Sequence, residues 1–144
     1  MTTTPDALAD HQAILTLLAR IAQSADTGEP EDYVEHFTED AVWDLTDATG
    51  LPLRTQTLRG RHALLAGVRE RRAAGVQGPG SATRHDVSTV VVDLDGDRAR
   101  SRSYFRYYLA TDAQPQLAAM GTYDDEFVRT EAGWRLHRRV IGRG

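Results

Sequence analysis

The sequence predicts a single α+β domain over residues 1–144, a cone in which three N-terminal helices pack on a strongly curved antiparallel sheet and enclose a pocket. The apolar residues follow a helical period in the first half of the chain and a period of two from about Thr83 onward. Short connections separate the later runs, and strands joined in this way pair as antiparallel neighbours. A chain of 144 residues is the usual length of one domain.

Three helices are expected before the sheet. The first runs from about Asp6 to about Ala25 and ends before Gly28, a residue that often terminates helices. A second, short helix follows Pro30, near 31–37, and a third covers about 61–72. The apolar stripe of the first helix consists of Ile14, Leu17, Leu18, Ile21, Ala22 and Ala25.

The strands are expected in two groups. A strand pair comes first, at about 41–45 and 53–58, separated by a loop that contains Gly50 and Pro52. Four alternating runs then cover residues 83–93, 98–110, 117–129 and 133–141. The Asp95-Gly96 turn between the first two of these runs is typical of a β-hairpin. A long curved sheet wrapped on helices leaves a natural pocket for a small ligand.

The composition excludes several classes of function. Hydrophobic residues make up 40% of the chain, charged residues 26%, and the net charge is −4. A mildly acidic domain lacks the basic face that nucleic acid requires, so no nucleic-acid partner is expected. The absence of cysteine excludes disulfides and thiolate-bound metals, and the five histidines show no metal-site spacing. No cofactor, metal or membrane partner is expected, and with no signal peptide or apolar span a cytoplasmic location is predicted.

Several short stretches, taken in order, resemble the SnoaL-like branch of the nuclear transport factor 2-like superfamily. They are 25–28 (Ala-Asp-Thr-Gly), 37–44, 83–89, 96–99 with 103–104, 121–125 and 133–134. The resemblance covers nearly the whole chain and implies the cone fold. The superfamily is similar to scytalone dehydratase, polyketide cyclases, limonene epoxide hydrolase, dehydrochlorinases and ketosteroid isomerase, and it also includes members without catalysis. Fold alone therefore does not decide the function.

The resemblance implies that Asp26 and His85 form a catalytic pair. In dehydratase- and dehydrochlorinase-like members, an aspartate after the first helix pairs with a histidine on the first strand of the meander. A carboxylate can orient one imidazole nitrogen so that the other takes up a proton. Read without the resemblance, Asp26 would cap a loop and His85 would be an ordinary strand residue. Epoxide hydrolysis is disfavoured, because the strand around Arg106 has no aspartate two residues away.

Further pocket residues are expected on the strands. Alternation in 98–110 places the face with Ser103, Phe105 and Tyr107 inward, and Tyr107 would then donate a hydrogen bond to the ligand. One arginine of the last strand could enter the cavity and stabilise an oxyanion, unless that strand faces solvent or a second copy. The expected substrate-binding residues are Tyr33, Trp43, Ser103, Phe105, Arg138 and Arg143.

The sequence therefore predicts a cofactor-independent acid/base enzyme of the dehydratase, lyase, isomerase or cyclase type. Its substrate would be small and largely apolar, of the polyketide or steroid kind. The alternative is a non-catalytic subunit of the same fold that binds a small ligand or a partner protein. A homodimer is expected through the outer face of the sheet, with Tyr104, Tyr108 and Tyr123 near the surface. The substrate's identity stays open.

Overall fold

The computed structural model describes residues 5–51 and 53–143, which form three helices and one six-stranded sheet. The helices are α1 (Pro5–Thr27), α2 (Pro30–Glu35) and α3 (Gly60–Ala73). The strands are β1 (Phe37–Leu45), β2 (Gln56–Arg59), β3 (Arg84–Asp95), β4 (Arg98–Leu109), β5 (Gln116–Thr130) and β6 (Gly133–Gly142). The α+β prediction is confirmed. The predicted limits differ at Phe37, which begins β1 instead of ending a helix, and at Leu53, which lies in the loop before β2.

The strand order across the sheet is β2-β1-β6-β5-β4-β3. Strands β3 to β6 form the predicted antiparallel meander, and β2 pairs with β1 in the antiparallel direction. The expectation of a wholly antiparallel sheet is wrong at one position, because β1 and β6 run parallel. These two strands lie at opposite ends of the sequence, and no short turn constrains their direction.

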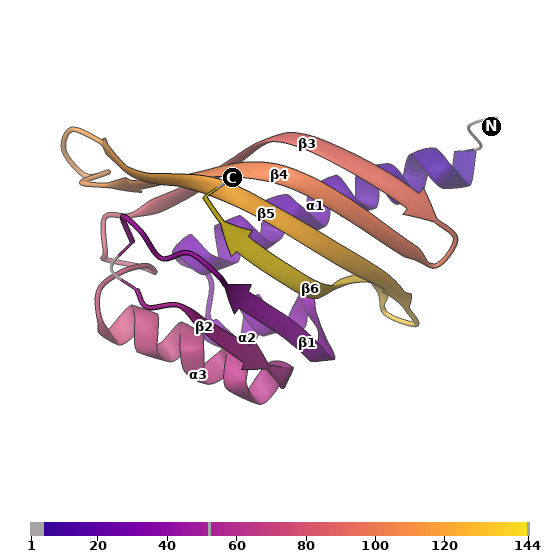
Figure 1. Cartoon of the computed structure of the whole chain (residues 1–144), viewed down its shortest axis with the longest axis horizontal. Coiled ribbons are helices and arrows are strands. Elements are labelled where there is room, and N and C mark those ends of the chain that lie inside the picture. The colour runs from indigo at the N-terminus through magenta and orange to yellow at the C-terminus, as the bar shows by residue number, and fades with distance from the viewer. Residues whose placement is uncertain (1–4, 52, 144) are drawn as a thin grey trace.

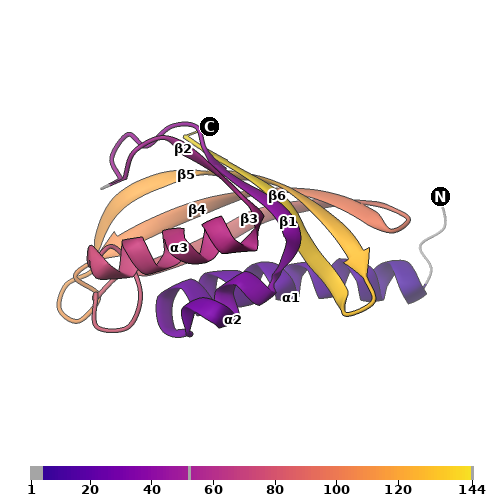
Figure 2. The same ribbon diagram turned by 90° about the horizontal axis from the view of Figure 1, so that it is seen from below.

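The sheet bends over the three helices, which all lie on its concave side (Figures 1 and 2). The side chains between the two layers form one hydrophobic core, in which Ile14, Phe37, Phe127 and Leu136 are completely or almost completely buried. The pocket described below borders this core, because core residues such as Leu18, Ile21 and Phe105 also line the pocket.

Register shifts interrupt the regular pairing of the meander, with the extra residues in β3, β5 and β6. They interrupt the pairing between Ser88 and Val91 of β3, between Tyr107 and Tyr108 of β4, and between Glu126 and Phe127 of β5. A β-bulge places an extra residue in one strand, bends that strand and changes which side chains face inward beyond it. In β3 the shift includes Thr89, whose φ of 55° lies in the left-handed region.

Helix α1 is attached to the sheet near its N-terminus by Asp10. The Asp10 carboxylate accepts hydrogen bonds of 2.8 and 2.7 Å from the Arg129 guanidinium and one of 3.0 Å from the Trp134 indole. These hydrogen bonds lower the pKa of Asp10 to about 2. No helix in residues 5–51 and 53–143 is both long enough and apolar enough to cross a bilayer.

The convex face of the sheet carries partly exposed apolar side chains among ion pairs. Tyr104 is 47% exposed and Met120 is 50% exposed, while Arg102 pairs with Asp124 and Arg106 pairs with Asp86. Tyr123 does not belong to this face, contrary to the expectation for the dimer: it points to the concave side and is 6% exposed.

We propose that two copies of the chain pair through this convex face, because its apolar residues and paired opposite charges can match a second copy of themselves. Tyr104→Glu would place a charge in the centre of such an interface, and the protein should then sediment as a monomer at micromolar concentration. Leu8→Glu changes an exposed residue of α1 and is the control. A wild-type protein that sediments as a monomer would contradict the proposal.

Gly121 of β5 is a position where the fold leaves no room for a side chain. A Cβ at this position would lie 2.3 Å from the backbone oxygen of Gly142 and 2.5 Å from the Phe105 ring. Gly121→Ala should therefore lower the free energy of unfolding by about 1–3 kcal/mol through overpacking. Gly142→Ala, whose Cβ would meet nothing closer than 3.5 Å, should cost much less. Urea denaturation of the two variants compares them, and equal stability would contradict this account of the contact.

Candidate functional site

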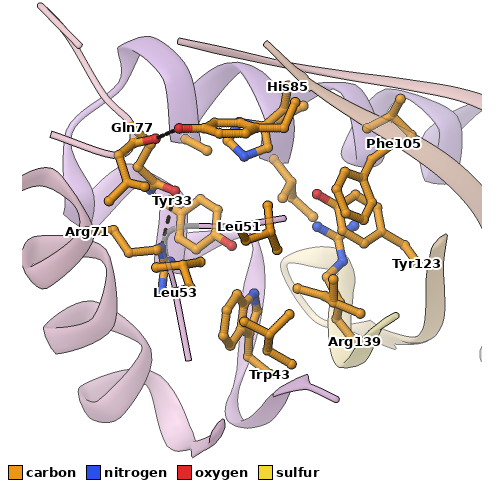
Figure 3. Close-up of a pocket in the computed structure, with 18 of the residues that line it drawn as sticks. Tyr33, Trp43, Leu51, Leu53, Arg71, Gln77, His85, Phe105, Tyr123 and Arg139 are labelled. Carbon is orange, nitrogen blue, oxygen red and sulfur yellow. Dashed lines mark hydrogen bonds between the residues drawn. The ribbon is translucent and has the colours of Figure 1, made fainter. Parts of the chain in front are cut away.

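A pocket opens between the concave face of the sheet, the end of α1 and the inner side of α3 (Figure 3). The space between atoms in this pocket, counted together with the open solvent at its edge, amounts to about 720 Å³. Apolar residues of every layer line it, among them Leu18, Ile21, Leu45, Val87 and Ile141. An outer groove beside α3 shares Leu51, Leu53, Arg71 and Val76 with the pocket and therefore adjoins it.

Asp26 lies in the last turn of α1 and is 8% exposed. The last carbonyl groups of a helix lack partners within the helix and need donors from elsewhere. Arg72 of α3 supplies them, because its Nη2 atom lies 3.0 Å from the carbonyl oxygen of Ser24 and 3.4 Å from that of Ala25. This contact holds the turn that carries Asp26 in place and adds a positive charge at the negative end of the helix dipole.

The Asp26 carboxylate holds His85 by its backbone and by its ring. Both carboxylate oxygens lie 3.2 Å from the backbone nitrogen of His85, and Oδ1 lies 2.8 Å from the ring atom Nδ1. A carboxylate can only accept hydrogen bonds, so Nδ1 carries the proton and the lone pair of a neutral ring lies on Nε2. Among the described residues, Nε2 has no hydrogen-bond partner, and His85 lines the pocket.

Tyr107 lies beside His85 with its hydroxyl already engaged. The two ring centroids are 5.3 Å apart, and the hydroxyl donates a hydrogen bond to the carbonyl of Val76. Burial raises the pKa of Tyr107, so the hydroxyl stays protonated and keeps this bond. The sequence analysis predicted that Tyr107 donates a hydrogen bond to the ligand, but in this conformation its proton is given to Val76 instead. Tyr107 packs against the imidazole and fixes the segment after α3.

Arg139, not Arg138, is the arginine of β6 that reaches the pocket. Its guanidinium is buried and makes two hydrogen bonds of 2.9 Å to the buried carboxylate of Asp125. Burial alone would lower the pKa of Arg139, but the Asp125 charge and hydrogen bonds outweigh it and raise that pKa above its usual range. The arginine therefore remains a cation whose charge is matched. It also stacks 3.7 Å from the centroid of the Tyr123 ring.

The register shift between β5 and β6 explains why Arg138, one of the expected substrate-binding residues, lies outside the pocket. Glu126 pairs with Arg138 whereas the next residue, Phe127, pairs with Leu136, so β6 has one extra residue at this point. Leu136 and Arg139 consequently both face inward, although they are three residues apart. Arg138 lies on the convex side near Glu126, with 48% of its side chain exposed.

Two other expected substrate-binding residues lie outside the pocket lining. Arg143 is exposed and donates a hydrogen bond of 3.1 Å to the carbonyl of Thr49. Ser103 faces inward as predicted and is fully buried, but it lies in the core rather than in the pocket wall. Its hydroxyl has no hydrogen-bond partner within the part of the chain that the structure describes.

The remaining expected residues, Tyr33, Trp43 and Phe105, all line the pocket, together with Tyr123. Phe105 stacks on Tyr123 with ring centroids 4.6 Å apart, and both belong to the sheet. Tyr33 comes from α2 and points its hydroxyl into the open space (Figure 3). These rings form apolar walls with polar groups at a few places, which suits a small aromatic or alicyclic ligand.

Arg71 of α3 is a pocket residue that we did not predict. The 69–72 segment reads as a basic helix end, yet Leu64, Val68 and Arg71 follow the i, i+4, i+7 spacing of one helix face, and this periodicity could have revealed it. Arg71 is 6% exposed, and its Nε donates a hydrogen bond of 3.2 Å to Gln77. Its guanidinium lies 4.7 Å from the centroid of the Trp43 ring. Burial lowers the pKa of Arg71.

The site offers acid/base groups and hydrogen-bond donors rather than ligands for a metal. Within residues 5–51 and 53–143, no group of three or more His, Asp or Glu side chains is arranged to hold a metal ion. The polar groups at the pocket are an imidazole held by a carboxylate, two guanidinium groups, a carboxamide and tyrosine hydroxyls. Together they can bind an oxygen-bearing ligand and move a proton.

A family model for the SnoaL-like domain matches residues 6–140, which is nearly all of the chain. The chain belongs to the SnoaL-like family. An uncharacterized protein from Mycobacterium tuberculosis, Rv2910c, is 30% identical over 135 residues, a match that covers 92% of this chain and 84% of that protein. The resemblance noted in the sequence is thereby confirmed.

Solved structures support the same fold. A variant of Rv3472, a protein of unknown function from M. tuberculosis, is similar with a TM-score of 0.81 and 25% identity, covering 100% of this chain and 78% of that one. An NTF2-like protein with a cystatin-like fold from Novosphingobium aromaticivorans has a TM-score of 0.76 at 24% identity, over 98% and 90%. A candidate scytalone dehydratase from the same organism has a TM-score of 0.68 at 20% identity, over 93% and 83%.

The buried Arg139–Asp125 pair gives a stability prediction. Asp125→Asn leaves the Arg139 charge buried without its counter-ion, and removing one member of such a pair typically costs about 3 kcal/mol or more. Asp124→Asn is the matched control, because Asp124 is its neighbour on the opposite face and forms an exposed pair with Arg102. The control should change the free energy of unfolding by about 0–1 kcal/mol. Chemical denaturation that gives equal losses for both variants would contradict this assignment.

Proposed function

We propose that the protein is a cofactor-independent acid/base enzyme that acts on a small, largely apolar substrate through His85 and Asp26. The observation that carries this proposal is the 2.8 Å contact between Asp26 Oδ1 and His85 Nδ1, in a pocket where none of the described residues is a hydrogen-bond partner of Nε2. An imidazole with this arrangement has its free lone pair directed away from the orienting carboxylate and available as a general base.

In this proposal, Nε2 removes a proton from carbon or oxygen of the substrate, and Asp26 stabilises the imidazolium that forms. In an elimination, the electron pair of the broken C–H bond becomes the new double bond and a hydroxyl group leaves. The imidazolium returns its proton to that hydroxyl, which departs as water, and the base is regenerated. An isomerisation would use the same first step and return the proton to another carbon.

The surroundings favour proton transfer over a structural role for the pair. Apolar walls exclude water and strengthen the electrostatic interaction between the carboxylate and the imidazolium. Tyr33 and Tyr123 can donate hydrogen bonds to an oxygen that becomes negative as the proton leaves. Burial raises the pKa of Tyr123, so its hydroxyl remains a donor at neutral pH. The likeness to a candidate scytalone dehydratase concerns the fold alone and is consistent with this class of chemistry.

The proposal predicts proton exchange that depends on His85. Wild-type protein is incubated in deuterium oxide with a panel of small cyclic hydroxy ketones and unsaturated ketones, and exchange or turnover is followed by NMR. His85→Ala should lower the rate on any active compound by about 10²–10⁴-fold. Asp26→Asn should also be severe, and the double variant should be scarcely slower than His85→Ala, because Asp26 acts through the imidazole.

Two variants serve as controls for the exchange experiment. Asp86→Asn changes the neighbouring exposed carboxylate, and His62→Ala removes an exposed histidine of α3. Both should keep wild-type rates. Exchange that persists in His85→Ala would contradict the catalytic assignment. A wild-type protein that binds members of the panel but exchanges none would favour the non-catalytic ligand-binding subunit.

A further inference from the structure

We propose that Arg71 binds a carboxylate group of the substrate, so that the pocket selects small apolar compounds that carry one negative charge. This inference rests on the proposed function for the identity of the site, because it names the class of substrate that the same pocket would accept. It is carried by the difference between the two arginines that line the pocket.

Those two arginines are both buried, but only one has a counter-ion. Arg139 makes two hydrogen bonds to the carboxylate of Asp125, and this pair is internally neutral. Arg71 forms no ion pair with any described residue, and its neighbour Glu70 is exposed. Burying a charged group costs free energy unless an opposite charge pairs with it. A bound anion would supply that opposite charge.

The contacts of Arg71 leave one edge of its guanidinium free. The Nε atom donates a hydrogen bond to Gln77, and the centre of the guanidinium lies 4.7 Å from the centroid of the Trp43 ring. The terminal Nη1 and Nη2 atoms have no hydrogen-bond partner among the residues described. Two such N–H groups match the two oxygens of a carboxylate in the bidentate arrangement that arginine favours.

The fold provides space for this guanidinium at Gly67, one helical turn before Arg71. A Cβ on Gly67 would lie 3.2 Å from Nη1 of Arg71 and 2.7 Å from a methyl group of Leu58. Any larger residue at this position would push against the guanidinium. The position of the charged group is therefore shaped by the helix itself and is not a random orientation of a surface side chain.

The size of the charge indicates a carboxylate rather than a phosphate. Among the described residues that line the pocket, Arg71 is the one arginine without a counter-ion, and the walls are mainly apolar. A monoanion would leave the pocket neutral, whereas a phosphate dianion would leave an excess negative charge. His85 and Arg71 lie on different sides of the open space (Figure 3). A substrate held by its carboxylate at Arg71 would thus extend its apolar body along the aromatic walls toward His85.

The experiment compares two probes of the same shape, 2-naphthoate and its neutral amide 2-naphthamide, by isothermal titration calorimetry. Wild-type protein should bind the acid about 10- to 100-fold more tightly than the amide, the range expected for hydrogen bonds to a charged group. Arg71→Met should abolish this preference. Arg69→Met removes the same charge from the exposed face of the same helix and should leave the preference unchanged.

Two more variants separate this inference from the proposed function and from a failure to fold. Arg71→Lys keeps the charge without the planar fork and should retain a weaker preference for the acid. His85→Ala should keep the full preference, because the carboxylate would lie at Arg71 in either case. Equal affinity of the wild type for both probes, no binding of either at millimolar concentration, or a preference that survives in Arg71→Met would overturn the inference. None of these outcomes depends on whether the protein catalyses proton transfer.

Discussion

The curvature of the sheet is the constraint on which the pocket depends. A flat sheet laid on three helices would close against them with side chains throughout, as it does around Phe127 and Leu136. The register shifts place extra residues in β3, β5 and β6, and a strand bends at such a position. At the end of the sheet near His85, a pocket remains between the strands and the helices. The same shifts decide which side chains point into the resulting space. Shape and chemistry in this protein therefore have a common origin in the extra residues of the strands.

Two buried carboxylates, Asp125 and Asp26, have different roles at the site. Asp125 and Arg139 neutralise each other, and this pair fixes the wall formed by β5 and β6 next to Tyr123. Asp26 is used differently, because it accepts hydrogen bonds from both the backbone and the ring of one histidine and so determines the tautomer of that ring. A rigid wall and an oriented base are complementary requirements for a site that moves a proton without a cofactor.

The sequence identified what depends on local periodicity and on the order of motifs. The three helices, the meander and the inward face containing Phe105 and Tyr107 follow from spacing, and the family resemblance brought Asp26 and His85 together across 59 positions. The prediction that Arg138 lines the pocket was wrong, because an extra residue in a strand cannot be recognised from the alternation of polar and apolar residues. The parallel pairing of β1 with β6 could not be predicted for a similar reason. It joins segments far apart in the sequence, and no turn between them indicates that they are neighbours. Arg71 is a different case. Its spacing from Leu64 and Val68 places it on the inner face of the helix, but a charged residue at a helix end is ordinarily assigned to the surface.

Adjacent arginines at the end of α3 limit how the chain length can change around the site. Arg71 faces the pocket and Arg72 holds the carbonyl groups at the end of α1, so one turn of helix supports both the lining of the cavity and the turn that carries Asp26. One residue inserted into or deleted from α3 would rotate this turn by about 100° and disrupt both contacts at once. Among its described residues, the segment between β1 and β2 contributes the apolar side chains of Leu51 and Leu53 to the pocket. A change of length in that segment would therefore reshape one wall of the cavity, whereas a change of length in α3 would move the groups that hold the site together.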